Sequence, residues 1–278
     1  MQKIAYLLVC MIFIACLVGC GQQKQTLAEQ PSEYNQLHRI ESGELEQNTV
    51  INEGLTELLP DLKDLIRDSL RNMDYLDWAQ FESLFEIREF KKPELAGDFA
   101  ETTAFYATGS HAIVVCPKFF DVGDGDQQTY VLAHEAVHAL VGVGKNGEES
   151  SVNLFVEGIT DYLVDSMLTG TNLKYSLTYQ NELYCIHWLV ALYGTDQITE
   201  IIYSGEIIDF VNEQSGKDNA GTMLHNALAT LDHSRDSGKV KEAILAEIDI
   251  LRAMSSSNIE VREKFTEIFE TAYAPYLN

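Results

Sequence analysis

The chain has 278 residues, of which 46% are hydrophobic and 22% are charged, and its formal net charge at pH 7 is −24. This length is sufficient for one sizeable domain, or for two subdomains packed tightly together. So acidic a surface argues against binding to nucleic acid and against adhesion to anionic lipid through charge, because both partners are themselves negatively charged.

The first 32 residues have the composition of a signal peptide followed by a tether. Lys3 supplies a short positive region, and residues 4–18 are apolar. This apolar stretch is short for a membrane span, which favours its removal as a signal peptide over residues 1–19. An ordinary transmembrane anchor and a generic signal peptide are the alternatives. Residues 20–32 are polar and rich in Gln, which is typical of a flexible tether.

The sequence Leu-Val-Gly-Cys that ends at Cys20 resembles a bacterial lipobox. The resemblance implies cleavage before Cys20 and attachment of lipid to it, so we expect a domain outside the cytoplasm that is anchored to the cell membrane. Of the other cysteines, Cys10 and Cys16 would leave with the signal peptide. Cys116 and Cys185 remain, and neither lies in a CxxC pair that would indicate a second zinc site. A disulfide between them is an alternative, but we expect two buried thiols.

Residues 33–95 have a helical pattern. Leucine and isoleucine recur there at helical spacing, and Pro60 marks a kink or a restart of the helix. Two runs of β-branched and aromatic residues follow, at 102–107 and 111–116, and Thr-Gly-Ser between them is typical of a hairpin turn. We therefore expect a helical N-terminal segment and then a small β-sheet.

The pentapeptide HEAVH at residues 134–138 predicts a metal site. On a helix, histidines four residues apart project from the same face, so that both rings can reach one zinc ion. The glutamate between them is placed to act on a metal-bound water. Apolar residues flank the motif at helical spacing, Asp126 is a candidate N-cap, and Gly142 with Gly144 is a candidate stop. A chance match in a surface helix is the alternative, expected in about one chain in a hundred.

Glu157 is the candidate third ligand. A catalytic tetrahedral zinc needs three protein ligands and an open position for water. Eighteen residues separate Glu157 from His138, which is enough for a reversing loop and a second helix packed antiparallel on the first. Gly158 would let those two helices approach closely. Asp161 lies one turn beyond Glu157, where it can accept the spare N–H of a ligating imidazole. The alternative is that both acids belong to a solvated face.

HEAVH followed by VEGITDY resembles the gluzincin metallopeptidases, in which a glutamate on the next helix completes HExxH. The interval of eighteen residues is similar to the aminopeptidase-like branch, and the Asp four residues after the Glu is similar to the thermolysin-like pattern. The resemblance implies that His134, His138 and Glu157 are the zinc ligands. It also implies that Glu135 is the general base and that Asp161 is the carboxylate behind a ligand.

Two related patterns fit less well. Metzincins need Gly and His three and six positions after the second histidine, where this chain has Val141 and Gly144. Aspzincins use an Asp ligand in a Gly-Thr-x-Asp context, which residues 158–161 only approach. Asp161 as the ligand in place of Glu157 is a minor alternative.

Hydrolysis of a peptide also requires a donor, besides the metal, for the developing oxyanion. The segment YQNE that begins at Tyr179 resembles the Tyr-Glu-Lys-Gly segment of the aminopeptidase branch, with Glu in place of Gly. The resemblance implies that Tyr179 is this donor. Tyr184, His187 and His225 are rival donors, although each is expected in a core or surface role. The chain lacks the Gly-x-Met-Glu-Asn stretch of such aminopeptidases, which favours endopeptidase action or another specificity.

Gluzincins resemble one another in binding substrate as an added strand at a sheet edge before the HExxH helix, a mode in which main-chain pairing gives affinity. The alternative is that the sheet only supports the helix. We thus expect an α+β, predominantly α-helical protein with a small mixed sheet, whose edge strand packs on the HExxH helix. A zinc-peptidase core would occupy residues 96–195, and a helical C-terminal segment residues 196–278.

The sequence therefore predicts a lipid-anchored extracellular zinc metallopeptidase with peptide or protein substrates. Two other functions fit the same residues. One is a catalytically inactive gluzincin-like surface protein that binds a partner. The other is a hydrolase that acts on a different amide, such as a cell-wall peptide.

Overall fold

The structure is a computed structural model that describes residues 42–123, 125–141 and 153–277. The predicted signal peptide, tether and lipidation site at Cys20 lie outside these residues, as do the candidate stop glycines Gly142 and Gly144. In the described part of the chain, no helix combines the length and the apolar composition that crossing a membrane requires.

The elements follow one another in this order: α2 (Ser42–Asn48), β1 (Thr49–Ile51), α3 (Glu53–Thr56), α4 (Leu59–Leu70), α5 (Trp78–Ser83), β2 (Glu86–Phe90), η2 (Pro93–Glu101), β3 (Ala104–Ala107), β4 (Ala112–Val115), η3 (Pro117–Asp121), α6 (Gly125–Val141), α7 (Asn153–Leu168), α8 (Gln180–Tyr193), α9 (Thr195–Ser204), α10 (Ile207–Ser215), α11 (Ala220–His233), α12 (Ser237–Met254), α13 (Ile259–Ala272) and α14 (Ala274–Leu277).

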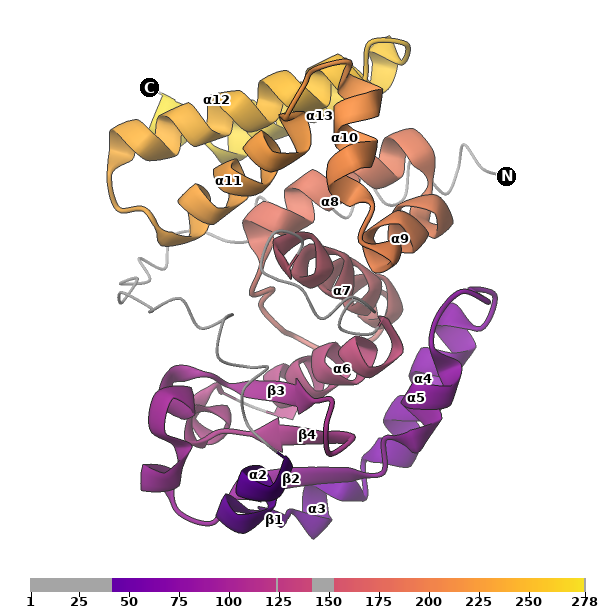
Figure 1. The fold of residues 1–278 in the computed structure, drawn as a ribbon, viewed down its shortest axis with the longest axis vertical. Helices are drawn as coiled ribbons and strands as arrows, with labels where there is room; N and C mark the ends of the chain where they lie inside the picture. The colour runs from indigo at the N-terminus through magenta and orange to yellow at the C-terminus, as the bar shows by residue number, and fades with distance from the viewer. Residues whose placement is uncertain (1–41, 124, 142–152, 278) are drawn as a thin grey trace.

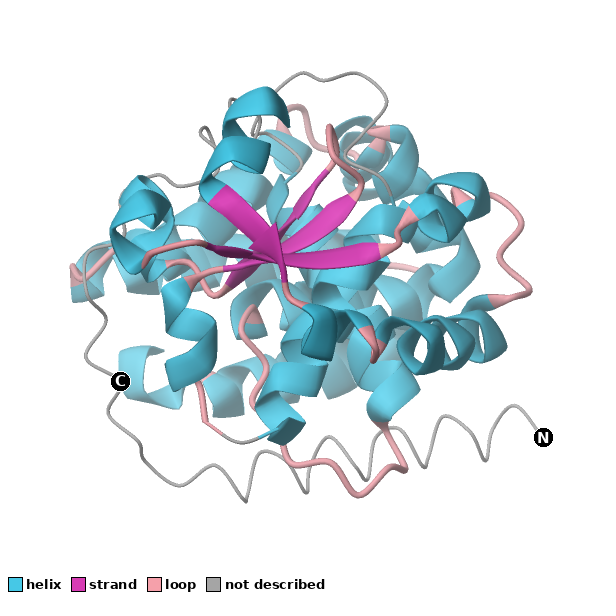
Figure 2. Cartoon of the chain, turned by 90° about the horizontal axis from the view of Figure 1, so that it is seen from below, coloured by secondary structure: helices cyan, strands magenta, loops and turns pink. Residues whose placement is uncertain are grey.

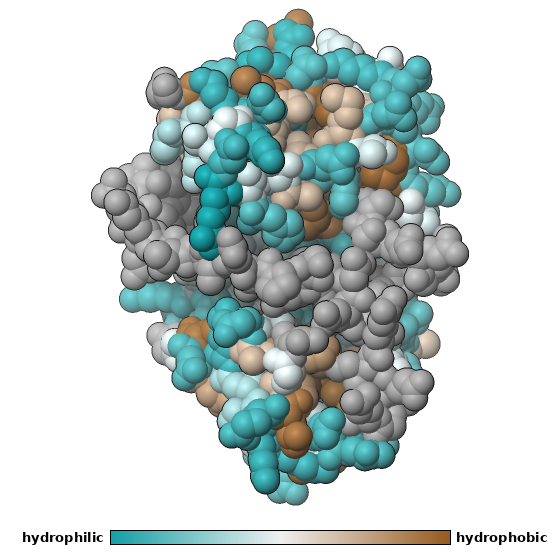
Figure 3. All heavy atoms as spheres, turned by 60° about the vertical axis from the view of Figure 1, so that its left-hand side comes forward, coloured by the Kyte–Doolittle hydropathy of each residue, from teal (hydrophilic) through white to brown (hydrophobic). Residues whose placement is uncertain are grey.

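Helices dominate the fold, and a four-stranded sheet lies at one end of it. Helix α6 lies against the sheet, α7 and α8 follow it outward, and the helices after α8 fill the opposite end of the molecule (Figure 1). The predicted fold class, α+β and mainly helical with a helical C-terminal part, is confirmed. Where Figure 3 colours the surface by hydropathy, most of it is hydrophilic and apolar side chains are scattered, in keeping with the charge of the chain.

The sheet has the strand order β1-β2-β4-β3. Strands β3 and β4 form the predicted antiparallel hairpin, β4 runs parallel to β2, and β2 runs antiparallel to β1. Seen from below, the sheet is surrounded by helices (Figure 2). Strand β3 is an edge strand of this sheet and contacts α6, so the predicted position of an edge strand on the HExxH helix is confirmed.

The prediction of a helical segment over residues 33–95 is wrong in part, because β1 and β2 lie within it. Strand β1 has only three residues, too few for a periodic pattern. In β2, Ile87 is buried in the main core, while Arg88 forms an ion pair with Glu86 at 2.6 Å. The sheet therefore crosses the predicted boundary at residue 96. Pro60 lies in the first turn of α4, which supports a restart of the helix rather than a kink.

All four residues of β4 are buried, since the strand is covered on both faces. One face joins the large core through Ile113 and Val115, and the other packs Val114 and Cys116 into a small second cluster. Cys185 is buried on α8. No disulfide joins the two thiols, as the sequence predicted.

Candidate metal centre

Helix α6 carries the HExxH residues through the interior of the protein. Eleven of its seventeen residues are buried, and they include His134 and Glu135. A helix that is apolar on most of its faces lies inside a protein, which explains why its polar residues are buried with it. The Nε2 atoms of His134 and His138 lie 3.0 Å apart, as expected for two histidines one turn apart on one face.

Glu157 on α7 completes this group. Its Oε2 lies 3.0 Å from Nε2 of His134 and 3.2 Å from Nε2 of His138. These three side chains could hold a metal ion, and no other set of three or more His, Cys, Asp and Glu residues in the described ranges converges in this way. The sequence-based choice of these residues as a metal site is therefore supported by their geometry.

The electrostatics of the cluster favour an ionised Glu157. Burial alone would raise the pKa of its carboxyl group, but His138 and His134 outweigh burial and hold the pKa well below its ordinary value. Burial would likewise lower the pKa of His134, but the carboxylates of Asp161 and Glu157 outweigh it and raise the pKa well above its ordinary value. A metal binds an ionised carboxylate and a neutral imidazole, so its binding here would release the proton that the raised pKa favours on His134.

Asp161 lies behind His134, not in the cluster. Its Oδ1 accepts a hydrogen bond from Nδ1 of His134 at 2.7 Å, which leaves Nε2 directed at Glu157. The structure thus places Asp161 where an outer carboxylate orients an imidazole, and it brings Glu157, not Asp161, into the cluster. A solvated acidic face is also excluded, because the exposed fractions of Glu157 and Asp161 are 9% and 0%.

Glu135 is buried beside the cluster and faces strand β3. Burial raises the pKa of its carboxyl group above its ordinary value, while His134, His138 and a hydrogen bond from the backbone of Tyr106 act in the opposite direction. Tyr106 belongs to β3, so the candidate base contacts the edge strand directly.

The edge of β3 that faces away from β4 can be deduced from the pairing of the two strands. The N–H of Cys116 donates to the carbonyl of Thr103, so Thr103 belongs to a hydrogen-bonded pair. Such pairs alternate along antiparallel strands, and the main-chain groups of Ala104 and Tyr106 therefore point away from β4. This edge faces α6, the helix that carries the cluster.

Tyr179 also lies at the cluster. It precedes α8, and its ring stacks on that of His134 with a centroid distance of 5.6 Å and an interplanar angle of 21°. Tyr179 thus lies beside the candidate metal ligands, and its role as an oxyanion donor stays a prediction.

The rival donors have aromatic neighbours within the helical part. Tyr184 packs against Phe269 at 6.0 Å between ring centroids. The ring of His187 contacts Tyr162 at 5.0 Å, and burial lowers the pKa of His187 to about 4. The ring centroid of His225 lies 6.3 Å from that of Phe155. These contacts fit a core role for all three, one of the two roles expected.

Two details of the sequence analysis need correction. Asp126 is not an N-cap: α6 begins at Gly125, and the carboxylate of Asp126 instead accepts the N–H of Lys174 at 3.0 Å. Gly158 does permit a close approach of helices, but the partner is α8. A Cβ atom at Gly158 would lie 2.8 Å from Cβ of Glu182. The sequence could not show this partner, because the contact joins residues 24 positions apart.

The sequence did not predict a role for Tyr130, which lies on α6. Its hydroxyl donates a hydrogen bond to Oδ1 of Asp161. The position of Tyr130, four residues before His134, was a usable indication, because residues four apart share a helix face.

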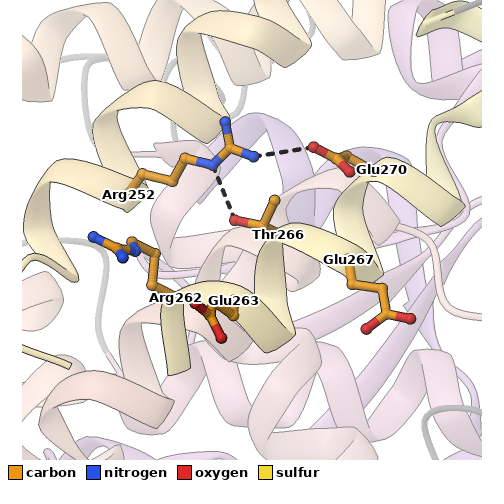
Figure 4. Close-up of a pocket in the computed structure, with 6 residues that line it drawn as sticks. All are labelled: Arg252, Arg262, Glu263, Thr266, Glu267 and Glu270. Atoms are coloured by element: carbon orange, nitrogen blue, oxygen red, sulfur yellow. Dashed lines mark hydrogen bonds and ion pairs between the residues drawn. The ribbon is translucent and has the colours of Figure 1, made fainter. Parts of the chain in front are cut away.

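A hollow on the surface of the C-terminal part involves α12 and α13 (Figure 4). It is lined by Arg252, Arg262, Glu263, Thr266, Glu267 and Glu270. Arg252 pairs with Glu270 at 3.0 Å and donates to Thr266 at 3.0 Å. The hollow shares no residue with the metal cluster, and its paired, exposed charges do not suggest catalysis.

Comparisons of the chain with protein-family models, with curated proteins and with solved structures find no match. The cluster itself is therefore the feature of the chain that points to a function.

Proposed function

We propose that this protein is a zinc metallopeptidase of gluzincin type that hydrolyses peptide bonds outside the cell, anchored to the membrane by lipid on Cys20. The observation that carries the proposal is the convergence of His134 and His138 from α6 with Glu157 from α7. Two imidazoles and one carboxylate are a ligand set of catalytic zinc sites, which keep a fourth position open.

The distances between the donor atoms suit zinc. Bonds of 2.0–2.2 Å in a tetrahedral arrangement place neighbouring ligand atoms about 3.3–3.6 Å apart. The separations in the cluster are 3.0, 3.0 and 3.2 Å, so only a slight expansion is needed. Calcium is disfavoured, because it prefers six or more oxygen ligands.

Each side chain then has a separate task. Bound zinc would lower the pKa of a water molecule and polarise the substrate carbonyl. Glu135, buried beside the ligands and with a raised pKa, is suited to accept a proton and return it to the leaving amine. Tyr179, stacked on His134, is the proposed donor to the oxyanion.

The proposed substrate is an extended peptide or protein segment. It would add as a strand to the edge of β3 that faces away from β4, where it would pair with the main-chain groups of Ala104 and the carbonyl of Tyr106, because the N–H of Tyr106 is bonded to Glu135. Because Tyr106 also contacts Glu135, a peptide bound at this edge would lie beside the proposed base.

The central test combines zinc analysis with proteolysis of an unstructured protein. Glu135→Gln keeps the shape of the side chain but removes its basicity, so we expect one zinc per chain and a loss of cleavage of about 10²- to 10⁴-fold. His138→Ala should lose the metal as well. His233→Ala is the matched control, because His233 is exposed at the end of α11 and should retain both zinc and activity.

The outcomes separate the functions considered. Full turnover by Glu135→Gln would remove that residue from its proposed role. Bound zinc without cleavage of peptides, unstructured proteins or cell-wall fragments would favour the inactive binding protein. Cleavage confined to cell-wall fragments would favour the hydrolase of another amide.

A further inference from the structure

Tyr130 is linked to the proposed metal ligands through a buried carboxylate. Its side chain is 1% exposed, and its hydroxyl donates to Oδ1 of Asp161. The same oxygen accepts the hydrogen bond from Nδ1 of His134 at 2.7 Å. One tyrosine hydroxyl, one carboxylate and one imidazole therefore form a continuous chain inside the protein.

The carboxylate of Asp161 is held from three sides. Tyr130 and His134 donate to Oδ1, and the main-chain N–H of Tyr179 donates to Oδ2 at 2.9 Å. Asp161 is fully buried, so solvent does not replace a donor that is lost. With three donors present, the carboxylate cannot turn away from His134 without breaking a hydrogen bond.

Tyr130 is itself fixed in place. Its ring stacks on Tyr175 with a centroid distance of 5.1 Å and an interplanar angle of 7°. Its hydroxyl oxygen also accepts the N–H of Thr178 at 3.4 Å. The hydroxyl thus connects α6, α7 and the segment that leads into α8, and it does so one helical turn from His134.

We propose that Tyr130 is a positioning residue for the metal centre: its hydroxyl holds Asp161, and Asp161 holds the ring of His134. This inference rests on the proposed zinc site and extends it to a residue outside HExxH…E. Removal of an outer partner of a metal ligand lowers metal affinity about 10- to 100-fold. Tyr130 acts through Asp161, so the lower end applies, and we expect Tyr130→Phe to weaken zinc binding about tenfold.

The chain offers a matched control in the neighbouring tyrosine. Tyr175 stacks on Tyr130, and its hydroxyl donates to Oδ1 of Asp165 at 2.8 Å. Asp165 lies one turn beyond Asp161 on α7. Tyr175→Phe therefore removes the same chemical group, bonded to the same kind of partner, beside but not within the chain to His134.

The experiment measures zinc affinity of the full chain by competition with a chromophoric chelator, together with the visible absorption of the Co²⁺-substituted protein. Tyr130→Phe should raise the zinc dissociation constant about tenfold and change the Co²⁺ spectrum, which reports ligand geometry. Tyr175→Phe should stay within about twofold of the wild type with an unchanged spectrum. Thermal unfolding in excess chelator measures the stability of each metal-free variant.

Non-additivity provides a second test. In an Asp161→Asn background, Tyr130→Phe should cause little further loss, because the two residues act in series. Wild-type affinity and spectrum in Tyr130→Phe would overturn the inference but leave the metal site standing. Equal losses in Tyr130→Phe and Tyr175→Phe would also overturn it, since they would indicate a general packing effect. If the wild type itself bound no metal, the proposed function would fail instead.

Discussion

Gly158 is the position at which α7 and α8 come closest to a steric limit. A Cβ atom there would lie 2.8 Å from Cβ of Glu182, 2.9 Å from Cγ1 of Ile186 and 3.1 Å from the main-chain carbon of Glu182. Carbon atoms in favourable contact are about 3.5–4.0 Å apart. A change of rotamer moves neither atom of Glu182, so Gly158→Ala requires the two helices to separate locally by roughly 0.7 Å.

The size of the effect follows from two opposing terms. Overpacking of a well-packed interior costs about 1–3 kcal/mol, and a clash with backbone-fixed atoms belongs at the upper end. Replacing glycine by alanine within a helix stabilises the folded state by about 1 kcal/mol, because alanine has the higher helix propensity. We therefore expect Gly158→Ala to lower the free energy of unfolding by about 2 kcal/mol.

The assay is urea unfolding of the metal-free protein, followed by circular dichroism. Gly54→Ala is the control, since it makes the same change within α3, where the nearest atom to a new Cβ is Oδ1 of Asn52 at 3.7 Å. The control should be as stable as the wild type or slightly more so. Wild-type stability in Gly158→Ala would refute the reasoning, because α7 and α8 could then not be in such close contact.

Four further predictions concern lipidation at Cys20, removal of the metal, the hydroxyl of Tyr179 and the buried carboxyl group of Glu247. Cys20→Ser should move the protein from the membrane fraction to the soluble fraction, and unchanged fractionation would contradict lipidation at Cys20. Chelation should abolish proteolysis and lower the melting temperature, and zinc at a hundred times its dissociation constant should restore about 2.7 kcal/mol of stability. Tyr179→Phe should lower kcat about 10²- to 10³-fold at unchanged zinc content, and an unchanged kcat would exclude Tyr179 as the oxyanion donor. Burial raises the pKa of Glu247 well above its ordinary value, and the charge of Asp232 raises it further. The folded state therefore binds the proton of Glu247 more tightly than the unfolded state does. The free energy of unfolding consequently falls as pH rises through the folded pKa. Glu247→Gln should therefore flatten the pH dependence of urea unfolding above the ordinary pKa of a glutamate, which an unaltered slope would contradict.

The parts of the site that the sequence predicted are those that depend on short-range regularity. His134 and His138 converge because four residues make about one helical turn. Glu157 was found because the loop length and the apolar pattern allow an antiparallel second helix. The hairpin of β3 and β4 was predicted for the same reason, since its strands are neighbours in the chain.

What the sequence did not predict depends on contacts between distant residues. Strand β1 exists because Val50 pairs with Glu89, a partner 39 positions away. The hydroxyl of Tyr130 donates a hydrogen bond to Asp161, which lies 31 positions further along the chain. The partner of Gly158 was assigned to the wrong helix, because a glycine indicates that something approaches closely but not which element does.

One turn of α7 determines the positions of two other helices relative to the cluster. Glu157 and Asp161 are four residues apart and both contact His134 of α6, whereas Gly158 is rotated by about 100° and contacts α8. Helix α8 begins directly after Tyr179, whose N–H is bonded to Asp161. A separation of α7 from α8 should therefore disturb both sides of the site.

Replacement of Glu247 provides a contrast to replacement of Gly158. It lies on α12 and is fully buried, and neither of its carboxylate oxygens has a hydrogen-bond partner among the described residues. Its replacement should change the stability of the helical part without moving a metal ligand. Gly158→Ala and Glu247→Gln should therefore differ when both the free energy of unfolding and zinc affinity are measured. Gly158→Ala should lower both quantities, whereas Glu247→Gln should change only the free energy of unfolding. If Glu247→Gln weakened zinc binding as much as Gly158→Ala does, the close contact between α7 and α8 would not be what holds the site together.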